Sequence, residues 1–433
     1  MAGTNEREIA AYILMDMQAD GSYSNLLLRK TLNKNNALAP TQKAFVTELV
    51  NGTLRNLLYL DFIIDQFSKT KTTKMKPFIL NVLRLGVYQL LFMDKTPDFA
   101  VCNEAVALVK KKGLQGLAGF VNGVLRGILR GKDSVALPDE AAMPAQFLSV
   151  RYSCPLWLTE RFIGQFGYAE AKAMLEMNCK PPDVTFCVNT CRTTVDALAE
   201  QLSAEGVTVR GKGRLVPNAL HVSGTSDMTA LPSYQQGLFH VMDESAMMAV
   251  LMAAPRPGMR IVDMCAAPGG KSFAAAYMAG DDTSILACDI YEHKIDLING
   301  GITRLGLQSV QAELRDAEKF DETLAETADI VLVDVPCSGF GLLRKKPDIR
   351  LARVEADIQP LAVLQRRILE NAARYVKRGG ALLYSTCTLT AEENEENADW
   401  FAQTFPFAEM ERKTILPQEH GTDGFFMARF VRE

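Results

Sequence analysis

The apolar residues of this chain change their spacing along the sequence, and that change limits the folds it can adopt. Through residues 5–131 they recur three and four positions apart, as on one face of a helix; Val46, Leu49 and Val50 are an example. From Asp243 onward, short apolar runs alternate with segments of helical spacing. The two patterns predict a multidomain protein, with an all-α N-terminal bundle and a C-terminal doubly wound parallel α/β sheet.

The stretch between these two patterns supplies the expected domain boundaries. Residues 132–144 (KDSVALPDEAAMP) are polar and contain proline, which is typical of a linker. Two short helices follow, and then strands and one helix that form a small α+β module. We therefore predict a helical domain at residues 1–135, a helical linker plus small α+β module at 145–242, and an α/β domain at 243–433.

The α/β domain contains one strand that is easy to place. Residues Ile330–Asp334 are almost continuously apolar, which indicates a strand buried on both faces of a parallel sheet. A helix is expected from about Asp357 to Val376. The other strands are expected at residues 260–263, 285–289, 310–314, 381–385 and 424–431.

The charge of the chain is distributed unevenly. The net charge is -4, but residues 1–134 carry 18 Lys and Arg against 11 Asp and Glu, a balance of +7 that leaves -11 for the remainder. A basic helical part fits an anionic partner such as RNA, although a merely solvated surface would explain the charge equally well.

The nine cysteines indicate a reducing compartment, because their number is odd and they are scattered. Cys187 and Cys191 are four apart, but no second pair or His cluster accompanies them, so we expect no metal site. The first residues, MAGTNEREIA, lack the basic and apolar stretches of a signal peptide. The apolar segment Phe78–Asp94 is too short and too polar to span a bilayer. We expect a cytoplasmic protein without a membrane segment.

A glycine-containing turn follows the first strand of the α/β domain. Asp263 ends that strand, and a helix is expected from about Gly270. Glycine lets a ligand approach the backbone closely, and the N-terminus of a helix suits a carboxylate or phosphate. An ordinary strand-to-helix turn also favours glycine, and the pattern matches neither G-x-G-x-x-G nor a P-loop. The candidate cofactor-binding residues in the turn are Cys265, Ala266, Ala267, Pro268, Gly269, Gly270 and Lys271.

Acidic residues stand at the ends of successive strands. Asp289 ends the second strand, Asp316 follows the third, and Asp334 ends the fourth. Open α/β sheets bind ligands at the carboxyl ends of their strands. A single such Asp is often only a turn residue, but the three together predict a binding site.

Two cysteines lie in the same kind of position. Cys337 follows the fourth strand in Pro-Cys-Ser, and Cys387 follows the next strand in Thr-Cys-Thr. A buried structural thiol is the commoner fate of a cysteine. Two cysteines at neighbouring strand ends, however, favour a role in covalent catalysis.

These motifs together resemble the NOL/NOP/Sun family of RNA 5-cytosine methyltransferases. The matching segments are Gly237–Ser245 (GLFHVMDES), the Asp263–Ser272 turn, DVPCSG from Asp334, STCT from Ser385, and Asp423–Arg429. The helical part is similar to the NusB-like RNA-binding fold. Met242 and Ser272 depart from the family pattern, which usually has Gln and Thr there, so no polar contact is expected from the side chain of residue 242.

The resemblance implies a Rossmann-like class I methyltransferase that uses S-adenosyl-L-methionine, with an RRM-like central module. Asp289 could accept hydrogen bonds from both ribose hydroxyls of that cofactor, and Ile290 could pack on its adenine. Asp316 could accept from the adenine amino group, while Asp334 would lie near the methyl group.

The resemblance also implies the reaction. A thiolate that adds to carbon 6 of cytosine makes carbon 5 nucleophilic. Spacing alone does not decide which cysteine attacks. By the resemblance, Cys387 is the nucleophile, Cys337 helps release the product by aiding removal of the carbon-5 proton, and Asp334 hydrogen-bonds the cytosine. The expected substrate is small-subunit (16S) ribosomal RNA, unassembled or partly assembled, and a monomer suffices.

Several charged side chains are candidates with open alternatives. Lys271 either pairs with the active-site carboxylates or is solvated, and the acidic run Glu392–Glu396 is expected to form the first turn of a helix. The candidate RNA-binding residues, which a solvated surface would explain as well, are Lys110, Lys111, Lys112, Arg344, Lys345 and Lys346.

Two other functions are compatible with the sequence. The chain could be an RNA-binding scaffold or antitermination-like factor whose methyltransferase domain is silent, although a silent site has no need for the cysteines and aspartates. It could also methylate cytosine in transfer RNA instead of ribosomal RNA.

Overall fold

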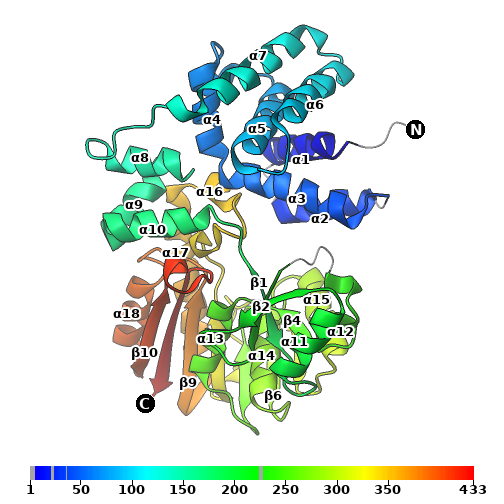
Figure 1. The fold of residues 1–433 in the computed structure, drawn as a ribbon. Helices are drawn as coiled ribbons and strands as arrows, with labels where there is room; N and C mark the ends of the chain where they lie inside the picture. The colour runs from blue at the N-terminus through cyan, green and yellow to red at the C-terminus, as the bar shows by residue number, and fades with distance from the viewer. Residues whose placement is uncertain (1–4, 21–23, 36, 224–227) are drawn as a thin grey trace. The chain divides into compact units, whose positions relative to one another are not determined.

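The computed structural model describes residues 5–20, 24–35, 37–223 and 228–433. The chain divides into two compact units (Figure 1). One, the helical unit, comprises Met1–Pro181 with Leu343–Ala352; the other, the sheet unit, comprises Pro182–Leu342 with Arg353–Glu433. In the part of the chain that the structure describes, none of the helices has the length and apolar character needed to cross a membrane.

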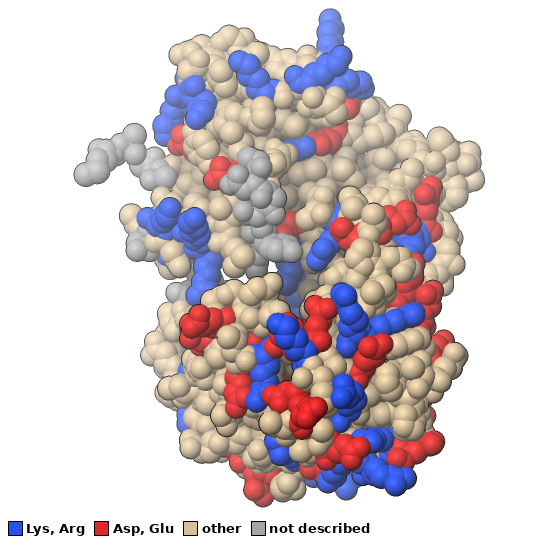
Figure 2. All heavy atoms as spheres, turned by 180° about the vertical axis from the view of Figure 1, so that it is seen from behind, with Lys and Arg blue, Asp and Glu red and all other residues tan. Residues whose placement is uncertain are grey.

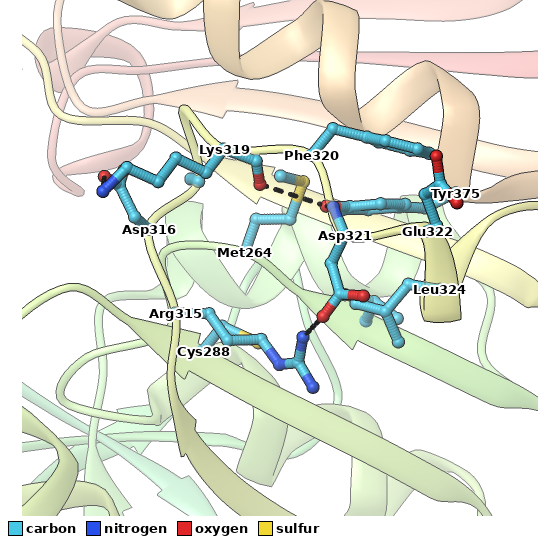
Figure 3. Close-up of a pocket in the computed structure, with 12 residues that line it drawn as sticks. Met264, Cys288, Arg315, Asp316, Lys319, Phe320, Asp321, Glu322, Leu324 and Tyr375 are labelled. Atoms are coloured by element: carbon cyan, nitrogen blue, oxygen red, sulfur yellow. Dashed lines mark hydrogen bonds and ion pairs between the residues drawn. The ribbon is translucent and has the colours of Figure 1, made fainter.

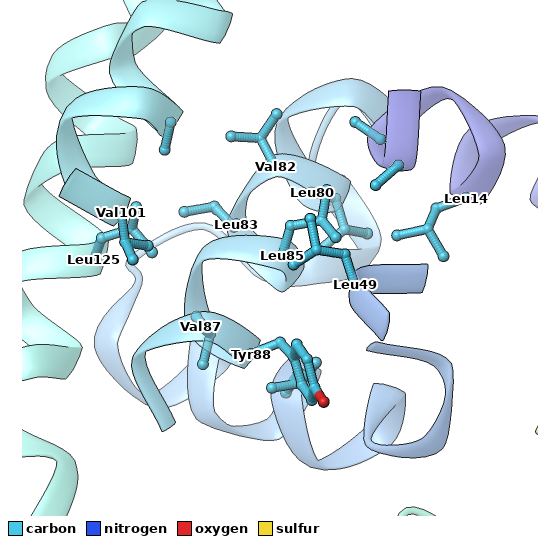
Figure 4. Packing of buried hydrophobic residues seen from close by; sticks show 14 of the residues in the cluster. Leu14, Leu49, Leu80, Val82, Leu83, Leu85, Val87, Tyr88, Val101 and Leu125 are labelled. Atoms are coloured by element: carbon cyan, nitrogen blue, oxygen red, sulfur yellow. The ribbon is translucent and has the colours of Figure 1, made fainter. Parts of the chain in front are cut away.

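The helical unit is built around α5 (Pro77–Phe92), which packs against α1, α3, α4, α6 and α7. Figure 4 shows Leu83, Leu85 and Tyr88 of α5 pointing into the shared core. Residues on all sides of α5 are buried, as expected for a predominantly apolar helix at the centre of a bundle. The surrounding helices are α1 (Glu6–Asp20), α2 (Ser24–Lys34), α3 (Pro40–Arg55), α4 (Leu57–Phe67), α6 (Asp98–Lys111) and α7 (Gln115–Gly131), which confirms the predicted all-α bundle.

The polar residues that excluded α5 as a membrane span are buried and paired. Arg84 donates to both carboxylate oxygens of Asp61, at 2.7 and 2.6 Å. Asn81 donates to Gln18 at 3.1 Å, and Gln89 accepts from Arg7 at 2.8 Å. Each buried polar group therefore has the partner that burial requires.

The helical unit extends beyond the boundary predicted from the sequence. Helices α8 (Pro144–Arg151), α9 (Leu156–Phe166) and α10 (Tyr168–Asn178) belong to it, although we grouped them with the α+β module. The backbone N–H of Leu58 donates to the side chain of Ser153 at 2.9 Å, and α8 packs on α4. A polar linker sequence therefore does not mark the boundary of the compact unit.

A short segment after the DVPCSG motif also belongs to the helical unit, so the predicted 243–433 domain is interrupted. It contains α16 (Ile349–Ala352) and the buried Arg350, which is 1% exposed. The guanidinium of Arg350 donates to backbone carbonyls in four places: the C-terminal ends of helices α3 and α10, the loop between α8 and α9, and the segment before α16. The acceptors are the carbonyls of Arg55 (3.1 Å), Tyr152 (3.3 Å), Ser153 (2.9 Å), Asn178 (3.4 Å) and Leu343 (3.1 Å).

We predict that Arg350→Lys destabilises the helical unit. Lysine keeps the charge but cannot present the planar fork of donors that these carbonyls surround. The lost charge-assisted hydrogen bonds should lower the free energy of unfolding by about 3 kcal/mol, and calorimetry should show a lower Tm. The matched control is Arg353→Lys, because Arg353 is half-buried and its ion pair with Asp357 is long, at 4.0 Å. Equal Tm values for the Arg350→Lys variant and the parent would contradict this role.

The sheet unit begins with the small α+β module expected from the sequence. Its antiparallel sheet has the strand order β2-β3-β1-β4. Phe186 and Phe239 stack on neighbouring strands, with ring centroids 3.9 Å apart. The elements are β1 (Val184–Val188), α11 (Val195–Ala204), β2 (Thr208–Lys212), β3 (Ala219–Ser223), α12 (Pro232–Gln235) and β4 (Phe239–Val241).

The large sheet of this unit is seven-stranded, in the order β10-β11-β9-β8-β5-β6-β7. Strands β5 to β9 form the expected parallel sheet, and β11 adds to one edge of it, antiparallel to both β9 and β10. We missed β10 because its charged side chains hide the apolar signal, as is common for an edge strand. The strands are β5 (Arg260–Asp263), β6 (Ser284–Asp289), β7 (Val310–Leu314), β8 (Ala328–Asp334), β9 (Val376–Thr386), β10 (Phe407–Ile415) and β11 (Phe425–Arg432).

Helices cover both faces of this sheet, and strand order places the candidate site. Helices α13 (Glu244–Ala253), α14 (Gly270–Met278) and α15 (Glu292–Leu305) pack on one face, and α17 (Ile358–Tyr375) and α18 (Glu395–Thr404) on the other. The order reverses at β5, which pairs with β6 on one side and β8 on the other. Ligands of open α/β sheets bind outside the carboxyl ends of the strands at such a point.

Candidate active site

The turn after β5 has the geometry of a ligand cradle. Gly269 has a φ of +103°, and a Cβ atom there would lie 2.3 Å from the ring of Phe273, so only glycine fits. Helix α14 begins at Gly270. Its N-cap residue is Gly269, which has no side chain to cap the first N–H groups. The first N–H groups of α14 therefore suit an anionic group of a ligand.

Asp263 stands at the start of this turn with one carboxylate oxygen engaged. Ser272 Oγ donates to Oδ2 at 2.7 Å, so serine supplies the hydroxyl where the family usually has threonine. Within the described residues no donor reaches Oδ1, although it is buried. Burial raises the pKa of Asp263 to about 7, despite the opposing effects of Ser272 and Lys271. A buried oxygen without a partner is the kind of group that a bound amine or hydroxyl would satisfy.

Asp289 and Asp316 stand at the ends of β6 and β7. Asp289 is buried and accepts from the backbone of Tyr291 at 3.3 Å, while Lys294 Nζ lies 3.4 Å from its carboxylate. Ile290 beside it is 50% exposed. A buried carboxylate next to an exposed apolar side chain suits a ligand that has hydroxyl groups and a flat ring.

A cavity of about 350 Å³ opens beside Asp316 (Figure 3). Asp316 accepts from the backbone of Glu318 at 3.0 Å and pairs with Lys319 at 3.3 Å. The rings of Phe320 and Tyr375 stack on the opposite wall, with centroids 5.4 Å apart. The structure thus brings Asp316 to a hollow of the size that small ligands occupy.

Lys271 and Asp334 form an ion pair at the centre of the site. Lys271 Nζ lies 2.6 Å from Asp334 Oδ2 and 5.0 Å from the centre of the Phe425 ring. Ser385 Oγ donates to Asp334 Oδ1 at 3.0 Å. Lys271 is only 8% exposed, so of the two alternatives left open by the sequence the structure shows the pairing with a carboxylate.

Cys337 and Cys387 converge at the neighbouring ends of β8 and β9. Their Sγ atoms are 3.2 Å apart, within hydrogen-bond distance. The pKa of Cys337 is raised well above its usual value, mainly by the hydrogen bond with Cys387 and to a smaller extent by burial. Cys337 therefore stays a thiol near neutral pH and can donate to the sulfur of Cys387.

The acidic run after Cys387 departs from its predicted role. Helix α18 begins at Glu395, so only Glu395 and Glu396 lie in its first turn. Glu393 precedes the helix and is fully buried, and it accepts from the backbone N–H of Ser338 at 2.8 Å. The sequence offered no signal that distinguishes Glu393 from its acidic neighbours.

The candidate RNA-binding residues all belong to the helical unit. Lys110, Lys111 and Lys112 are exposed. Lys111 pairs with Glu8 at 2.6 Å, while the ammonium of Lys112 lies 4.7 Å from the centre of the Tyr12 ring. These contacts leave the lysines at the surface, where phosphate could reach them.

Arg344 differs from the other candidates because it is buried. Its guanidinium donates to the carbonyls of Lys180 at 3.3 Å and Pro181 at 2.9 Å. We therefore withdraw Arg344 as a phosphate contact, whereas Lys345 is half-buried and Lys346 is exposed. Figure 2 shows Lys and Arg gathered over the helical part of the chain, and mixed with Asp and Glu over the rest.

Among the residues that the structure describes, no group of three or more His, Cys, Asp or Glu is arranged to hold a metal ion.

Family models of known proteins match three parts of the chain. Residues 250–431 match the model of the 16S rRNA methyltransferase RsmB/F family, and residues 4–130 match the NusB family. Residues 154–229 match the ferredoxin-like domain of RsmF/B-like methyltransferases.

Full-length relatives share the whole arrangement. The probable ribosomal RNA small subunit methyltransferase B of Bacillus subtilis is 37% identical and covers 99% of this chain and 98% of its own. The protein of the same name from Synechocystis is 34% identical, and the match covers 98% of this chain and 99% of that protein. The crystal structure of PH0851 is 26% identical, covers 99% of both chains and has a TM-score of 0.82.

We predict that Asp263→Asn stabilises the ligand-free protein in a pH-dependent way. The carboxyl group has a pKa of about 7 in the folded state and an ordinary value near 3.8 when unfolded. The parent therefore loses stability as the pH rises from about 4 to about 7, by at most about 1.4 kcal/mol per pH unit. Asparagine does not titrate, so the Tm difference in its favour should grow over that range and then level off.

Thermal unfolding at about pH 5 and about pH 8 measures this difference. Asp282→Asn is the control, because Asp282 is exposed. A Tm difference for Asp263→Asn that is the same at both pH values, or that shrinks as the pH rises, would contradict the buried carboxylate described above.

Proposed function

The chain belongs to the 16S rRNA methyltransferase RsmB/F family, and on that premise we propose that it transfers a methyl group from S-adenosyl-L-methionine to carbon 5 of a cytosine in 16S ribosomal RNA. Membership confirms the predicted family resemblance and the methyltransferase class. The observation that carries the finer proposal is the 3.2 Å approach of Cys337 Sγ and Cys387 Sγ.

The residues of the turn and the strand ends fit the cofactor. Its amino-acid part would lie at the N-terminus of α14 and the free oxygen of Asp263, its ribose at Asp289, and its adenine at Ile290 and Asp316. When bound, the cofactor supplies a methyl group on a positively charged sulfur. The residues proposed to hold it are Cys265, Ala266, Ala267, Pro268, Gly269, Gly270, Lys271, Asp289, Asp316 and Asp334.

Cys387 is the proposed nucleophile. Its thiolate would form a bond to carbon 6 of the cytosine and so make carbon 5 nucleophilic toward the methyl group, which the bound cofactor would supply as its sulfur–methyl bond breaks. A base would then take the carbon-5 proton, the electron pair of that C–H bond would reform the double bond, and the carbon 6–sulfur bond would break to release the thiolate of Cys387. Asp334 is held by Lys271 and Ser385, which places its carboxylate to accept a hydrogen bond from the base.

Cys337 is proposed to act in product release. Because its pKa is raised, Cys337 remains a thiol and can donate a hydrogen bond to the sulfur of Cys387. That hydrogen bond stabilises the negative charge that returns to Cys387 as it leaves carbon 6. This geometry supports a role of Cys337 in stabilising the departing sulfur of Cys387. The resemblance implies a second role, which is to aid removal of the carbon-5 proton.

We further propose that the enzyme works as a monomer in the cytoplasm on RNA that is free or only partly assembled. All nine cysteines are free, which suits a reducing compartment. The target base must leave its stack to reach a site at the edge of the sheet, and a base in unassembled RNA can do so more easily. Exposed Lys110, Lys111, Lys112 and Lys346, with half-buried Lys345, are the proposed phosphate contacts.

We predict that the two cysteine substitutions have different effects. Cys387→Ala should abolish methylation, because no thiol is left to attack carbon 6. In the Cys337→Ala variant, Cys387 should still attack carbon 6, but the RNA should be released slowly. A covalent enzyme–RNA complex should therefore accumulate. The measurements are tritiated methyl transfer to 16S RNA and denaturing gel electrophoresis of the complex.

Cys191→Ala is the matched control, because Cys191 is exposed and is not one of the two converging cysteines. Full activity in the Cys387→Ala variant would refute the assignment of the nucleophile. Methylation of transfer RNA but not of 16S RNA by the parent enzyme would refute the proposed substrate.

A further inference from the structure

A buried glutamate links the loops that carry the two cysteines. Glu393 is 0% exposed, although it lies in a run of acidic residues. One of its carboxylate oxygens accepts from the backbone N–H of Ser338 at 2.8 Å, and the other accepts from the hydroxyl of the same serine. Ser338 directly follows Cys337, so the carboxylate holds both hydrogen-bonding groups of the residue next to that cysteine.

The loop of Cys387 enters the same network. Thr388 directly follows Cys387, and its hydroxyl lies 2.7 Å from the hydroxyl of Ser338. Thr390, farther along this loop, donates to Glu393 Oε2 at 2.7 Å. The residues that follow the two cysteines are thus joined to each other and to one carboxylate.

Glu393 is itself fixed to the core of the sheet unit. Gln365 of α17 donates to Glu393 Oε1 at 2.9 Å, and the hydroxyl of Tyr384 on β9 donates to the backbone carbonyl of Glu393. Gln365 in turn accepts from Asn397 of α18 at 2.9 Å. Hydrogen bonds through Glu393 therefore connect the cysteine loops to α17, α18 and β9.

We propose that Glu393 is a positioning residue that sets the distance between Cys337 Sγ and Cys387 Sγ, and through it the release step; the second part rests on the function proposed above. The charge of Glu393 also contributes to raising the pKa of Cys337, after the hydrogen bond with Cys387 and burial. The hydrogen bonds of Glu393 and its charge thus act in the same direction. Both favour a Cys337 thiol that donates to the sulfur of Cys387.

The test compares Glu393→Gln with Glu396→Gln. Glutamine has nearly the same shape but no charge, so the hydroxyls of Ser338 and Thr390 must turn to accept from its amide group and the charge-assisted hydrogen bonds are lost. Glu396 lies in the same acidic run and is exposed, which makes it the matched control.

The first readout needs no RNA. Diamide accepts two electrons and two protons as the thiols of Cys337 and Cys387 join in a disulfide, and mass spectrometry of the linked peptides follows the rate. Loss of the Glu393 charge would by itself lower the pKa of Cys337 and speed oxidation, so slower disulfide formation would report the positions of the two sulfur atoms. The loss of a charge-assisted hydrogen bond should slow the formation of this disulfide roughly tenfold in Glu393→Gln. The Glu396→Gln variant should match the parent, and calorimetric binding of S-adenosyl-L-methionine should be unchanged in both variants.

The second readout follows the proposed reaction. During turnover with 16S RNA, a larger fraction of Glu393→Gln than of the control should be trapped as the covalent complex. Ser338→Ala, which removes one hydroxyl and keeps the backbone N–H, should shift both readouts in the same direction by less. This variant decides the matter if Glu393→Gln does not fold.

An unchanged rate of disulfide formation in the folded Glu393→Gln variant, or in Ser338→Ala if Glu393→Gln does not fold, would overturn the positioning role. That outcome is distinct from failure of the proposed function, which the parent enzyme would show as absence of methyl transfer to RNA. A slower disulfide with no change in the trapped fraction would overturn the link to release.

Discussion

The parallel pairing of β8 and β9 is the constraint on which the site depends. Parallel neighbours end at the same edge of the sheet, and Asp334 is in register with Ser385 across this pair. Cys337 and Cys387 leave the two strand ends at similar distances, so their sulfur atoms meet at 3.2 Å. The same edge carries Asp263 and the glycine turn of β5, because β5 is the parallel neighbour of β8 on its other side.

Beyond the strand ends, backbone contacts and the hydrogen bonds of Glu393 join the two loops that carry the cysteines. The N–H of Gly341 donates to the carbonyl of Cys387 at 3.0 Å, and a Cβ atom on Gly341 would lie 1.9 Å from the carbonyl of Gly424. Glycine is thus required where the cysteine loops and the start of β11 approach one another. The chain then passes into the helical unit at Leu343, where Arg350 is bound by backbone carbonyls.

The sequence allowed prediction of those features that follow from strand ends and local motifs. The glycine turn, the aspartates and the two cysteines each stand directly after an apolar run, so topology alone brings them to one edge. Glu393 and Arg350 could not be found in this way, because each is a charged residue among other charged residues, and burial by distant segments gives it its role. Strand β10 was missed for a related reason, since its alternating charges resemble a solvated segment.

In the proposed reaction, Cys387 attacks the cytosine while Cys337 stays a thiol beside it. This reaction can be tested with 16S RNA in which fluorine replaces the hydrogen on carbon 5 of the target cytosine, because the carbon 5 of the adduct then has no proton to lose and the enzyme stays attached. We expect a covalent, methylated complex in which mass spectrometry of the digested protein finds the RNA on Cys387. RNA attached to Cys337, or methylation without any covalent complex, would contradict it.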